Sequence, residues 1–371
     1  MMVEKIRLGI LLGGRSGEHE VSLMSSRSVI SVIDKNKYDV VQIGIDHVGQ
    51  WWSGKDVIGS FEKGNTEGLY RVFILPEPGN PYLYKRELIG KNEEIEVHSV
   101  LDAVFPVLHG TFGEDGTLQG LFELADIAYV GAGVTGSAVG MDKGIFKDLM
   151  RANGIPVVES IVFSRKDVES DINGILQDAE DSFPYPMFIK PANLGSSVGI
   201  TKAKNRADLL EGVHEAALYD RRILIERGLD AREIEISVLG NENPRASVPG
   251  EIKPSDEFYS YKAKYINGKS GLFIPAPISK SLIKEVQDIA VKTYRAIDCA
   301  GMARVDFLLE RHTDKLFINE VNTIPGFTSI SMYPKLWEAS GLPYADLVDE
   351  LIGLALERKA ERGKSKRIFG D

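Results

Sequence analysis

The chain has 371 residues, of which 43% are hydrophobic and 26% charged, and its formal net charge is −10. That length provides for two or three domains with buried cores, and the acidic balance argues against a general nucleic-acid binder or a membrane-surface protein. The single cysteine, Cys299, excludes an intrachain disulfide and a cysteine-rich zinc site. Because the sequence also has no apolar run of about 18 residues and no signal-peptide pattern, we expect a cytoplasmic protein that does not enter a membrane.

The first predicted domain, residues 1–136, alternates strands and helices in the manner of an open parallel α/β fold. An apolar run at 6–12 predicts a strand, a helical pattern follows at 21–33, and a second strand is predicted at 38–46. Segment 47–95 is rich in glycine, proline and aromatic residues and has no recognisable motif, so we interpret it as an insertion. The remaining predicted elements are a strand at 100–108, a helix at 118–124 and a short strand at 128–130.

Two further domains are predicted. The predicted fold class of the chain is α/β (α+β). The second, 137–226, begins with a helix for which Asp142 is the predicted N-cap. The third, 227–371, contains the strand REIEISVLG, a helix with an apolar stripe at 279–299 and a pair of strands near its end. The other predicted elements are strands at 157–163, 186–190 and 223–226, and helices at 206–218 and 345–362.

The sequence MARVDFLLERHTDKLFINEVN predicts two strands joined by a polar turn. If the hairpin is symmetric about that turn, Asp306 lies opposite Glu320 and Arg304 lies opposite Asn322. Two carboxylates that face each other at about 5 Å repel, and bound Mg²⁺, which prefers oxygen ligands, would offset that repulsion. The alternative interpretation is a structural carboxylate pair that Arg304 neutralises.

Two lysines are candidates for phosphate binding. Lys190 ends a predicted strand just before a glycine- and serine-rich turn, whose backbone N–H groups are suited to an anion. The lysine precedes the glycines and no helix follows directly, so the pattern is not a Walker P-loop. Lys143, at the start of a predicted helix, is the second candidate. An exposed flexible turn and an ordinary surface lysine remain the alternatives.

Carboxylates and a polar loop in the second half of the chain are compatible with nucleotide binding. Glu226 ends an apolar strand and Glu233 follows a short connector, where each is able to accept hydrogen bonds from a ribose or a base. Most such carboxylates are simply solvated. The segment SYKAKYINGK suits a lid over phosphates, with Lys264 and Tyr265 facing inward, but it also suits a disordered surface loop.

The N-terminal segment GGRSGEHE does not have the G-x-G-x-x-G spacing of a dinucleotide-binding loop. An alternative is a site for a small zwitterion, in which the helix N-terminus attracts a carboxylate and Glu18 attracts an ammonium group. His109 ends a strand at the same carboxyl edge of the predicted sheet. In NTIPGFTSIS, the N–H of Gly326 is a candidate to bind an oxyanion together with Arg304, although the segment alone is only a turn.

The order of these motifs resembles the D-alanine–D-alanine ligase family of the ATP-grasp superfamily. The matching segments, between about residue 6 and residue 350, are LLGGRSGEHEVSL, LHGTFGEDGTLQGLFE, MDK, IKPANLGSSVGI, LIERGLDAREIEISVLG, YKAKY, GMARVDFLL and NEVNTIPGFTSIS. The resemblance implies a three-domain ATP-grasp architecture, with the domain limits given above and ATP held between the last two domains.

Positions that match the family's motifs imply individual roles. ATP would be contacted through its phosphates, base and ribose by Lys143, Lys190, Glu226, Glu233, Phe258, Lys264 and Leu308. Mg²⁺ or Mn²⁺, at two ions per active site, would be held by Asp306, Glu320 and Asn322. The first D-alanine would be bound by Glu18 and His109, and the second by Ser331 and Met332. Arg304 and Gly326 would hold the oxyanion, and the family's hydrogen-bonded set that fastens the lid matches Glu18, Ser196 and Tyr265.

The resemblance implies that ATP converts one D-alanine to a D-alanyl phosphate, which the amine of a second D-alanine attacks to give D-alanyl-D-alanine, ADP and phosphate. The product would serve peptidoglycan precursor synthesis, and a homodimer is expected from the family. Tyr265 favours the dipeptide over an ester, because ester-forming relatives have a different lid.

Three other functions fit the sequence less well. Another ATP-grasp ligase with a different carboxylate substrate would not require the matches at Glu18, His109 and Tyr265. A dinucleotide-dependent oxidoreductase conflicts with the glycine spacing in the N-terminal segment. A catalytically inactive binding protein has no support, because every matched chemical position is occupied.

Overall fold

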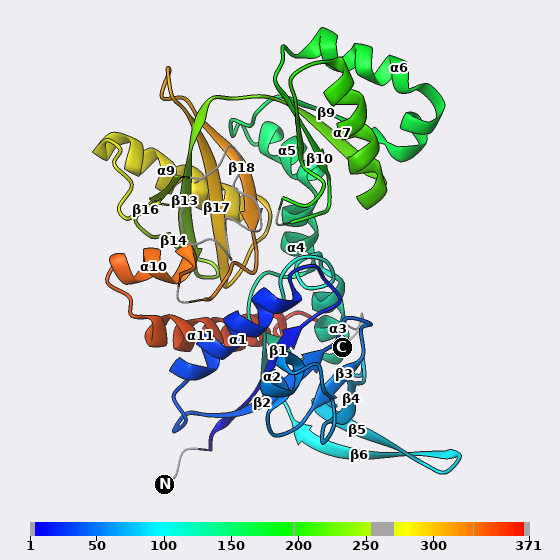
Figure 1. Cartoon of the computed structure of the whole chain (residues 1–371). Coiled ribbons are helices and arrows are strands. Elements are labelled where there is room, and N and C mark those ends of the chain that lie inside the picture. The colour runs from blue at the N-terminus through cyan, green and yellow to red at the C-terminus, as the bar shows by residue number, and fades with distance from the viewer. Residues whose placement is uncertain (1–3, 196, 254–270, 329, 367–371) are drawn as a thin grey trace.

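The computed structural model describes residues 4–195, 197–253, 271–328 and 330–366. It contains three β-sheets, of eight, four and six strands, which follow one another along the chain. In Figure 1 the first sheet lies at the bottom, and the other two lie above it, the second on the right and the third on the left. Within these residues no helix combines the length and apolar character needed to cross a bilayer.

The first sheet has a parallel part and an antiparallel extension. Its parallel strands are β2 (Tyr38–Ile45), β1 (Ile6–Gly13), β7 (Ala103–Pro106) and β8 (Ala128–Tyr129), in that spatial order. This confirms the predicted βαβ opening, with α1 (His19–Val32) as the crossover helix. The segment interpreted as an insertion continues the sheet through β3 (Trp51–Ser53), β4 (Tyr70–Ile74), β5 (Tyr82–Ile89) and β6 (Asn92–Val100), with α2 (Val57–Glu62) between β3 and β4. These added strands are antiparallel because short turns join most of them.

The second sheet is antiparallel, and helices cover one of its faces. Its strands lie in the order β11 (Thr201–Ala203), β10 (Met187–Pro191), β12 (Arg222–Arg227) and β9 (Ser160–Ser164). Ile189 and Ile225 are fully buried against α6 (Arg165–Ser182) and α7 (Arg206–Tyr219). Because side chains alternate along a strand, Lys190 and Glu226 point to the opposite face.

The third sheet follows the same principle. Its strands lie in the order β16 (Gly271–Phe273), β15 (Gly250–Lys253), β13 (Ala231–Leu239), β17 (Met302–Glu310) and β18 (Leu316–Asn322), and β14 (Arg245–Ala246) pairs with β13. Ile236 and Val305 face α9 (Lys280–Ala296) in a buried apolar cluster. Glu235 and Asp306, paired in register, lie on the other face of the same strands.

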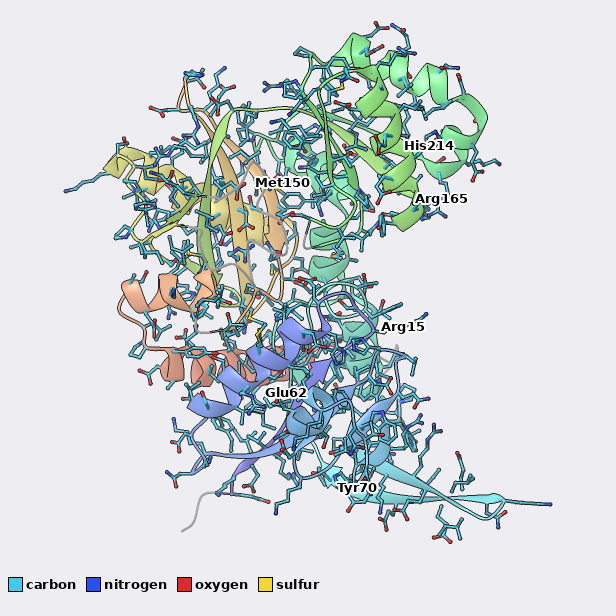
Figure 2. All side chains as sticks on the ribbon, in the orientation of Figure 1. Arg15, Glu62, Tyr70, Met150, Arg165 and His214 are labelled. Atoms are coloured by element: carbon cyan, nitrogen blue, oxygen red, sulfur yellow. The ribbon has the colours of Figure 1, made fainter. Side chains whose placement is uncertain are left out.

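The remaining helices of the described residues are α3 (Thr117–Ala125), α4 (Val134–Met141), α5 (Lys143–Ala152), α10 (Met332–Ala339) and α11 (Tyr344–Arg362). Helices α4 and α5 lie between the first and second sheets along the chain, and the loop at 228–230 joins the second sheet to the third. Asp142 is the N-cap of α5, as predicted, and its side chain accepts hydrogen bonds from Gly144 and Ile145 N–H. Met150 of α5, labelled in Figure 2, belongs to the apolar core of the third sheet.

The C-terminal helix α11, at the position predicted for the last helix, returns to the first sheet and packs its leucines against it. Leu347 and Leu351 share one buried cluster with Leu8 and Ile10 of β1. Helix α11 therefore packs on the first predicted domain, although the sequence pattern assigns it to the third. The domain limits near residues 136 and 226 remain predictions.

Candidate functional site

The predicted register of the β17–β18 hairpin is confirmed. Arg304 lies opposite Asn322 and Asp306 lies opposite Glu320. The register shifts directly after Asp306, which leaves Asn319 as an extra residue on β18 in a β-bulge. As a consequence, Asn319 and Glu320 both line a cleft with a volume of about 750 Å³ between the second and third sheets. Regular alternation in the sequence did not predict the bulge.

The charge on Asp306 is compensated within the hairpin. Arg304 donates to both of its carboxylate oxygens, with Nε–Oδ1 and Nη2–Oδ2 distances of 2.7 and 2.6 Å. The Asn322 side-chain amide donates to Oδ2 at 2.9 Å. The structural interpretation of the hairpin, a carboxylate neutralised by Arg304, therefore describes these contacts correctly.

Glu235 is a second partner of Arg304 that the sequence analysis missed. Its Oε2 lies 2.9 Å from Arg304 Nε, and the carboxylate is almost fully buried. Burial alone would lower the pKa of Arg304, but Asp306 and Glu235 outweigh it and hold that pKa well above its ordinary value. The signal was present in the strand REIEISVLG, where Glu235 lies two residues after Glu233 and so on the same face.

The hairpin also has the donor chemistry for a divalent cation. Asp306 and Glu320 offer carboxylate oxygens from facing positions, and Asn322 offers an amide oxygen beside them. This all-oxygen set is the one that Mg²⁺ prefers. Glu320 already lies near one cation, Lys143, with Oε2 at 3.8 Å from Nζ. The residues therefore fit Mg²⁺.

The two candidate phosphate lysines reach the same cleft from the second sheet and from α5. Lys143 is the first residue of α5, and its Nζ donates to Leu194 O at 2.7 Å, which ties it to the glycine-rich turn. Lys190 projects from β10, with its Nζ 3.1 Å from Glu226 Oε1. The predicted residues that line this cleft are Lys143, Lys190, Glu226, Glu233, Asp306, Leu308 and Glu320.

Glu226 is held inside the protein by two lysines. Its second oxygen, Oε2, lies 2.8 Å from Nζ of Lys147, which is almost inaccessible to solvent. Burial raises the pKa of Glu226, but the two ammonium groups outweigh burial and lower it to about 2. Lys147 was missed, although it lies four residues after Lys143 and so on the same face of α5.

Glu233 and Leu308 pair in register on β13 and β17 and face the cleft together. This arrangement places a carboxylate and an apolar side chain at one end of the cleft, which suits the polar and flat parts of a nucleoside. The other predicted residues of this group and of the lid, Ser196, Phe258, Lys264 and Tyr265, lie outside the described residues.

Glu18 lies between two glycine-containing loops. It directly precedes α1, and its Oε2 would be 2.5 Å from a β-carbon added at Gly110 and 3.2 Å from one added at Gly195. A β-carbon at Gly110 would displace the carboxylate, and one at Gly195 would crowd it. Glu18 therefore lies close to Gly195 of the glycine-rich turn, and its role in fastening the lid stays a prediction.

His109 and Glu114 join the first sheet to the loop that follows the hairpin. His109 Nδ1 lies 2.9 Å from Ile324 O, and its Nε2 lies 3.0 Å from Ser25 Oγ, so both ring nitrogens have protein partners. Glu114 accepts hydrogen bonds from Gly110 N–H and Ile324 N–H at 2.6 and 3.0 Å. Burial, reinforced by the charge of Glu18, raises the pKa of Glu114 to about 8.

The last predicted residues follow the same loop. Gly326 is partly buried, between the hairpin and α10. Ser331 precedes α10, and its Oγ lies 2.8 Å from Thr328 Oγ1. Met332 is buried against the cluster that includes Ile252. None of the three lines the cleft between the second and third sheets, and their assignment to the second D-alanine and the oxyanion stays a prediction.

Comparison with known proteins gives consistent matches. The family models described as "D-ala D-ala ligase N-terminus" and "D-ala D-ala ligase C-terminus" match residues 7–132 and 149–353. A curated relative from Natranaerobius thermophilus, named D-alanine--D-alanine ligase, is 48% identical over 370 residues and is covered completely, as is this chain.

Two solved structures are similar along nearly their whole length. The D-alanine-D-alanine ligase from Coxiella burnetii superposes with a TM-score of 0.81 at 38% identity, covering 98% of this chain and 97% of that one. The VanG D-Ala:D-Ser ligase from Enterococcus faecalis superposes with a TM-score of 0.83 at 34% identity, covering 95% of this chain and 100% of that one.

Proposed function

The chain belongs to the D-alanine–D-alanine ligase family and has its ATP-grasp fold, and from that premise we propose how its residues join two D-alanine molecules. The reaction consumes ATP and yields D-alanyl-D-alanine, ADP and phosphate, for peptidoglycan precursor synthesis. One observation carries the assignment of residues to this reaction. Lys143, Lys190 and the facing carboxylates of Asp306 and Glu320 converge on one cleft of nucleotide size.

The first step activates a carboxylate. A free carboxylate is a poor acyl donor because its leaving group would be oxide. Transfer of the γ-phosphoryl group of ATP to one carboxylate oxygen gives an acyl phosphate and ADP, so that the later leaving group is phosphate. Lys143 and Lys190 bind the phosphate oxygens and oppose the charge that develops during transfer. Asp306, Glu320 and Asn322 would hold Mg²⁺, or Mn²⁺, at up to two ions per site, which supplies further charge neutralisation when bound.

Lys190 is positioned for this role by Glu226. The carboxylate holds the ammonium group at 3.1 Å, and Lys147 keeps that carboxylate ionised from its other side. The Lys190 side chain is therefore already ordered before ATP binds, which lowers the entropic cost of binding the phosphates. We assign Glu226, Glu233 and Leu308, which line the cleft, to contacts with the base and the ribose. Phe258 is assigned to the same base.

The second step forms the peptide bond. Glu18 binds the ammonium group of the first D-alanine, and His109 lies beside its carboxyl end. The deprotonated amine of the second D-alanine, held next to Ser331 and Met332, attacks the acyl phosphate. The oxyanion is stabilised by Arg304 and the Gly326 N–H, and phosphate then leaves. Asp306 and Glu235 fix the Arg304 guanidinium in advance, so little reorganisation is needed.

Water must be kept from the acyl phosphate, because it would hydrolyse that intermediate. The assigned lid residues are Ser196, Lys264 and Tyr265, with Glu18 as their partner on the first sheet. We further assign the domain limits 1–136, 137–226 and 227–371, a cytoplasmic location where ATP is available, and a homodimeric assembly. Size-exclusion chromatography with light scattering tests the homodimer.

The activity is tested with purified protein, ATP, Mg²⁺ and D-alanine. We expect phosphate release together with D-alanyl-D-alanine, detected by mass spectrometry. Phosphate release with another carboxylate and amine pair, but none with D-alanine, would contradict the substrate assignment. Parallel reactions with D-alanine plus D-serine or D-lactate test the second position. The similarity to a D-Ala:D-Ser ligase makes D-serine the specific alternative, and formation of D-alanyl-D-serine in preference to the dipeptide would establish it.

A further inference from the structure

Two histidines and a glutamate, none of which lines the cleft between the second and third sheets, lie close together at one edge of the first sheet. His19 and Glu20 are the first residues of α1, and His47 lies in the turn between β2 and β3. One ligand atom from each side chain lies within 4.8 Å of the others. The group is placed on the rigid elements at the carboxyl edge of the sheet, because α1 follows β1 and the turn follows β2.

His19 is oriented as metal-binding histidines are. It is buried, and its Nδ1 lies 2.9 Å from Gly14 O. A carbonyl oxygen only accepts hydrogen bonds, so Nδ1 carries the proton and the lone pair of the neutral ring is on Nε2. A backbone carbonyl that fixes the tautomer in this way is the usual partner of a histidine that binds a metal ion. Gly13 permits the arrangement, because a β-carbon there would lie 2.8 Å from His19 Cε1.

His47 is presented by a well-ordered turn. Asp46 accepts hydrogen bonds from Val48 N–H, Gln50 N–H and Trp52 Nε1 at 3.0, 2.8 and 2.9 Å, which fixes the backbone on both sides of His47. The imidazole stacks on His19, with ring centroids 3.9 Å apart and planes inclined by 27°. The backbone is thus fixed while the ring itself stays exposed.

The spacing leaves room for an ion. His47 Nε2 and Glu20 Oε1 are 3.9 Å apart, too far for a hydrogen bond. Two ligands of one tetrahedral ion at about 2.1 Å are about 3.4 Å from each other. To bind one ion, the ligand atoms must therefore move closer together by about 1 Å. The His47 ring must also tilt away from its stacked position on the His19 ring. The side chains of His47 and Glu20 are 67% and 65% exposed, so each is bordered mainly by solvent.

We propose that His19, Glu20 and His47 form a binding site for Zn²⁺ or a similar transition-metal ion, with water completing its coordination. Two imidazole nitrogens and one carboxylate are a donor set that zinc accepts and that Mg²⁺ does not favour. The site is therefore chemically distinct from the all-oxygen set of the β17–β18 hairpin.

The bound ion would connect the turn after β2 to the start of α1. Glu18 directly precedes the two ligands on α1, and it is assigned to the ammonium group of the first D-alanine. Occupancy would hold this loop in one conformation and would favour the folded chain, because the three ligands come together only there. The inference about the metal site does not depend on ligase activity, since the ligands are separate from the assigned catalytic residues.

Zinc binding to the full chain tests the proposal. The protein is stripped with a chelator and kept in millimolar Mg²⁺, so that the oxygen site is saturated, and Zn²⁺ is added in a calorimeter without nucleotide or D-alanine. We expect one zinc ion per chain, and a visible absorption band when Co²⁺ replaces Zn²⁺. His47→Ala should weaken zinc binding at least about tenfold, and Glu20→Gln should weaken it less.

His312→Ala is the matched control, because it removes another exposed histidine, at the far end of the β17–β18 hairpin. Zinc affinity in this variant should equal that of the unmodified chain. Equal zinc affinity in His47→Ala and the unmodified chain would assign the binding to other residues and overturn the proposal. Absence of binding to the unmodified chain would also overturn it. Ligase activity is measured separately, so its loss would leave the interpretation of zinc binding unaffected.

Discussion

Lys147 and Glu226 form an ion pair of 2.8 Å that is almost wholly excluded from solvent, and through it α5 and β12 are joined behind the catalytic cleft. Lys190 approaches the other oxygen of the same carboxylate from β10. The three side chains form a buried charge network of two cations and one anion. The outermost member, Lys190, is the one assigned to phosphate.

Replacing Lys147 should therefore affect both stability and nucleotide binding. Lys147→Met keeps the length of the side chain but leaves Glu226 with one cation in place of two. We expect a loss of about 3 kcal/mol in the free energy of unfolding, measured in urea, and a higher KM for ATP because Lys190 is held more tightly to Glu226. Lys166→Met, an exposed lysine of α6, is the control. If the unfolding free energy of Lys147→Met equals that of the control, the buried pair is not a stabilising feature.

Glu320→Gln tests the metal assignment. The amide keeps the shape of the side chain but removes one of the two facing carboxylates, so turnover should fall by at least about a hundredfold while the melting temperature stays near its original value. The requirement for Mg²⁺ should shift to higher concentrations in phosphate-release assays. Glu310→Gln, at the turn end of the same hairpin, should behave as the unmodified chain. Near-normal turnover of Glu320→Gln would remove Glu320 from the metal site.

Arg304→Lys tests the oxyanion role. A lysine keeps the positive charge but cannot form the bidentate hydrogen bonds that Arg304 makes with Asp306. It also cannot contact Glu235 at the same time. We expect kcat to fall by about 10²–10³-fold, as for loss of one oxyanion donor, with a smaller change in the KM for ATP. The control is Arg295→Lys, an exposed residue in the last turn of α9, which does not line the cleft. A change confined to the KM for ATP would place Arg304 in nucleotide binding instead.

Glu114 should make stability depend on pH. Its pKa is raised to about 8, so between the ordinary value near 4.5 and that point the folded chain retains a proton that the unfolded chain has lost. The free energy of unfolding should therefore fall as pH rises, by about 2 kcal/mol between pH 5.5 and 7.5 for this group alone.

Urea denaturation at several pH values measures this effect as the difference between the unmodified chain and Glu114→Gln, which has no titrating group. Glu67→Gln, at an exposed position, provides the background slope. If the unmodified chain and Glu114→Gln lose stability in parallel as pH rises, the proton on Glu114 does not contribute.

Local patterns in the sequence predicted the parts of the site that lie on single elements. Alternation along two neighbouring strands predicted the pairing of Asp306 with Glu320, because the distance between them depends only on one short turn. An N-cap preference predicted Asp142, because that interaction is made with the next turn of its own helix. In both cases the partner is a few residues away or in a directly paired strand.

The segment interpreted as an insertion shows where such patterns fail. Its strands β3 to β6 extend the first sheet, but glycine, proline and aromatic residues interrupt their alternation. The bulge at Asn319 was not predicted for a related reason. One extra residue changes the face of every side chain beyond it, but it does not change the amino-acid composition of the strand.

The sequence by itself determined the family motifs, the hairpin register, and which carboxylates and lysines were available for nucleotide chemistry. Only the tertiary structure decided which of these charges compensate one another. Lys147 on α5 meets Glu226 on β12, and Glu235 on β13 meets Arg304 on β17, because helices and strands from distant segments pack together. Burying a charge without a partner destabilises the folded state strongly. Each charge buried by this packing therefore pairs with an opposite charge from another segment of the chain.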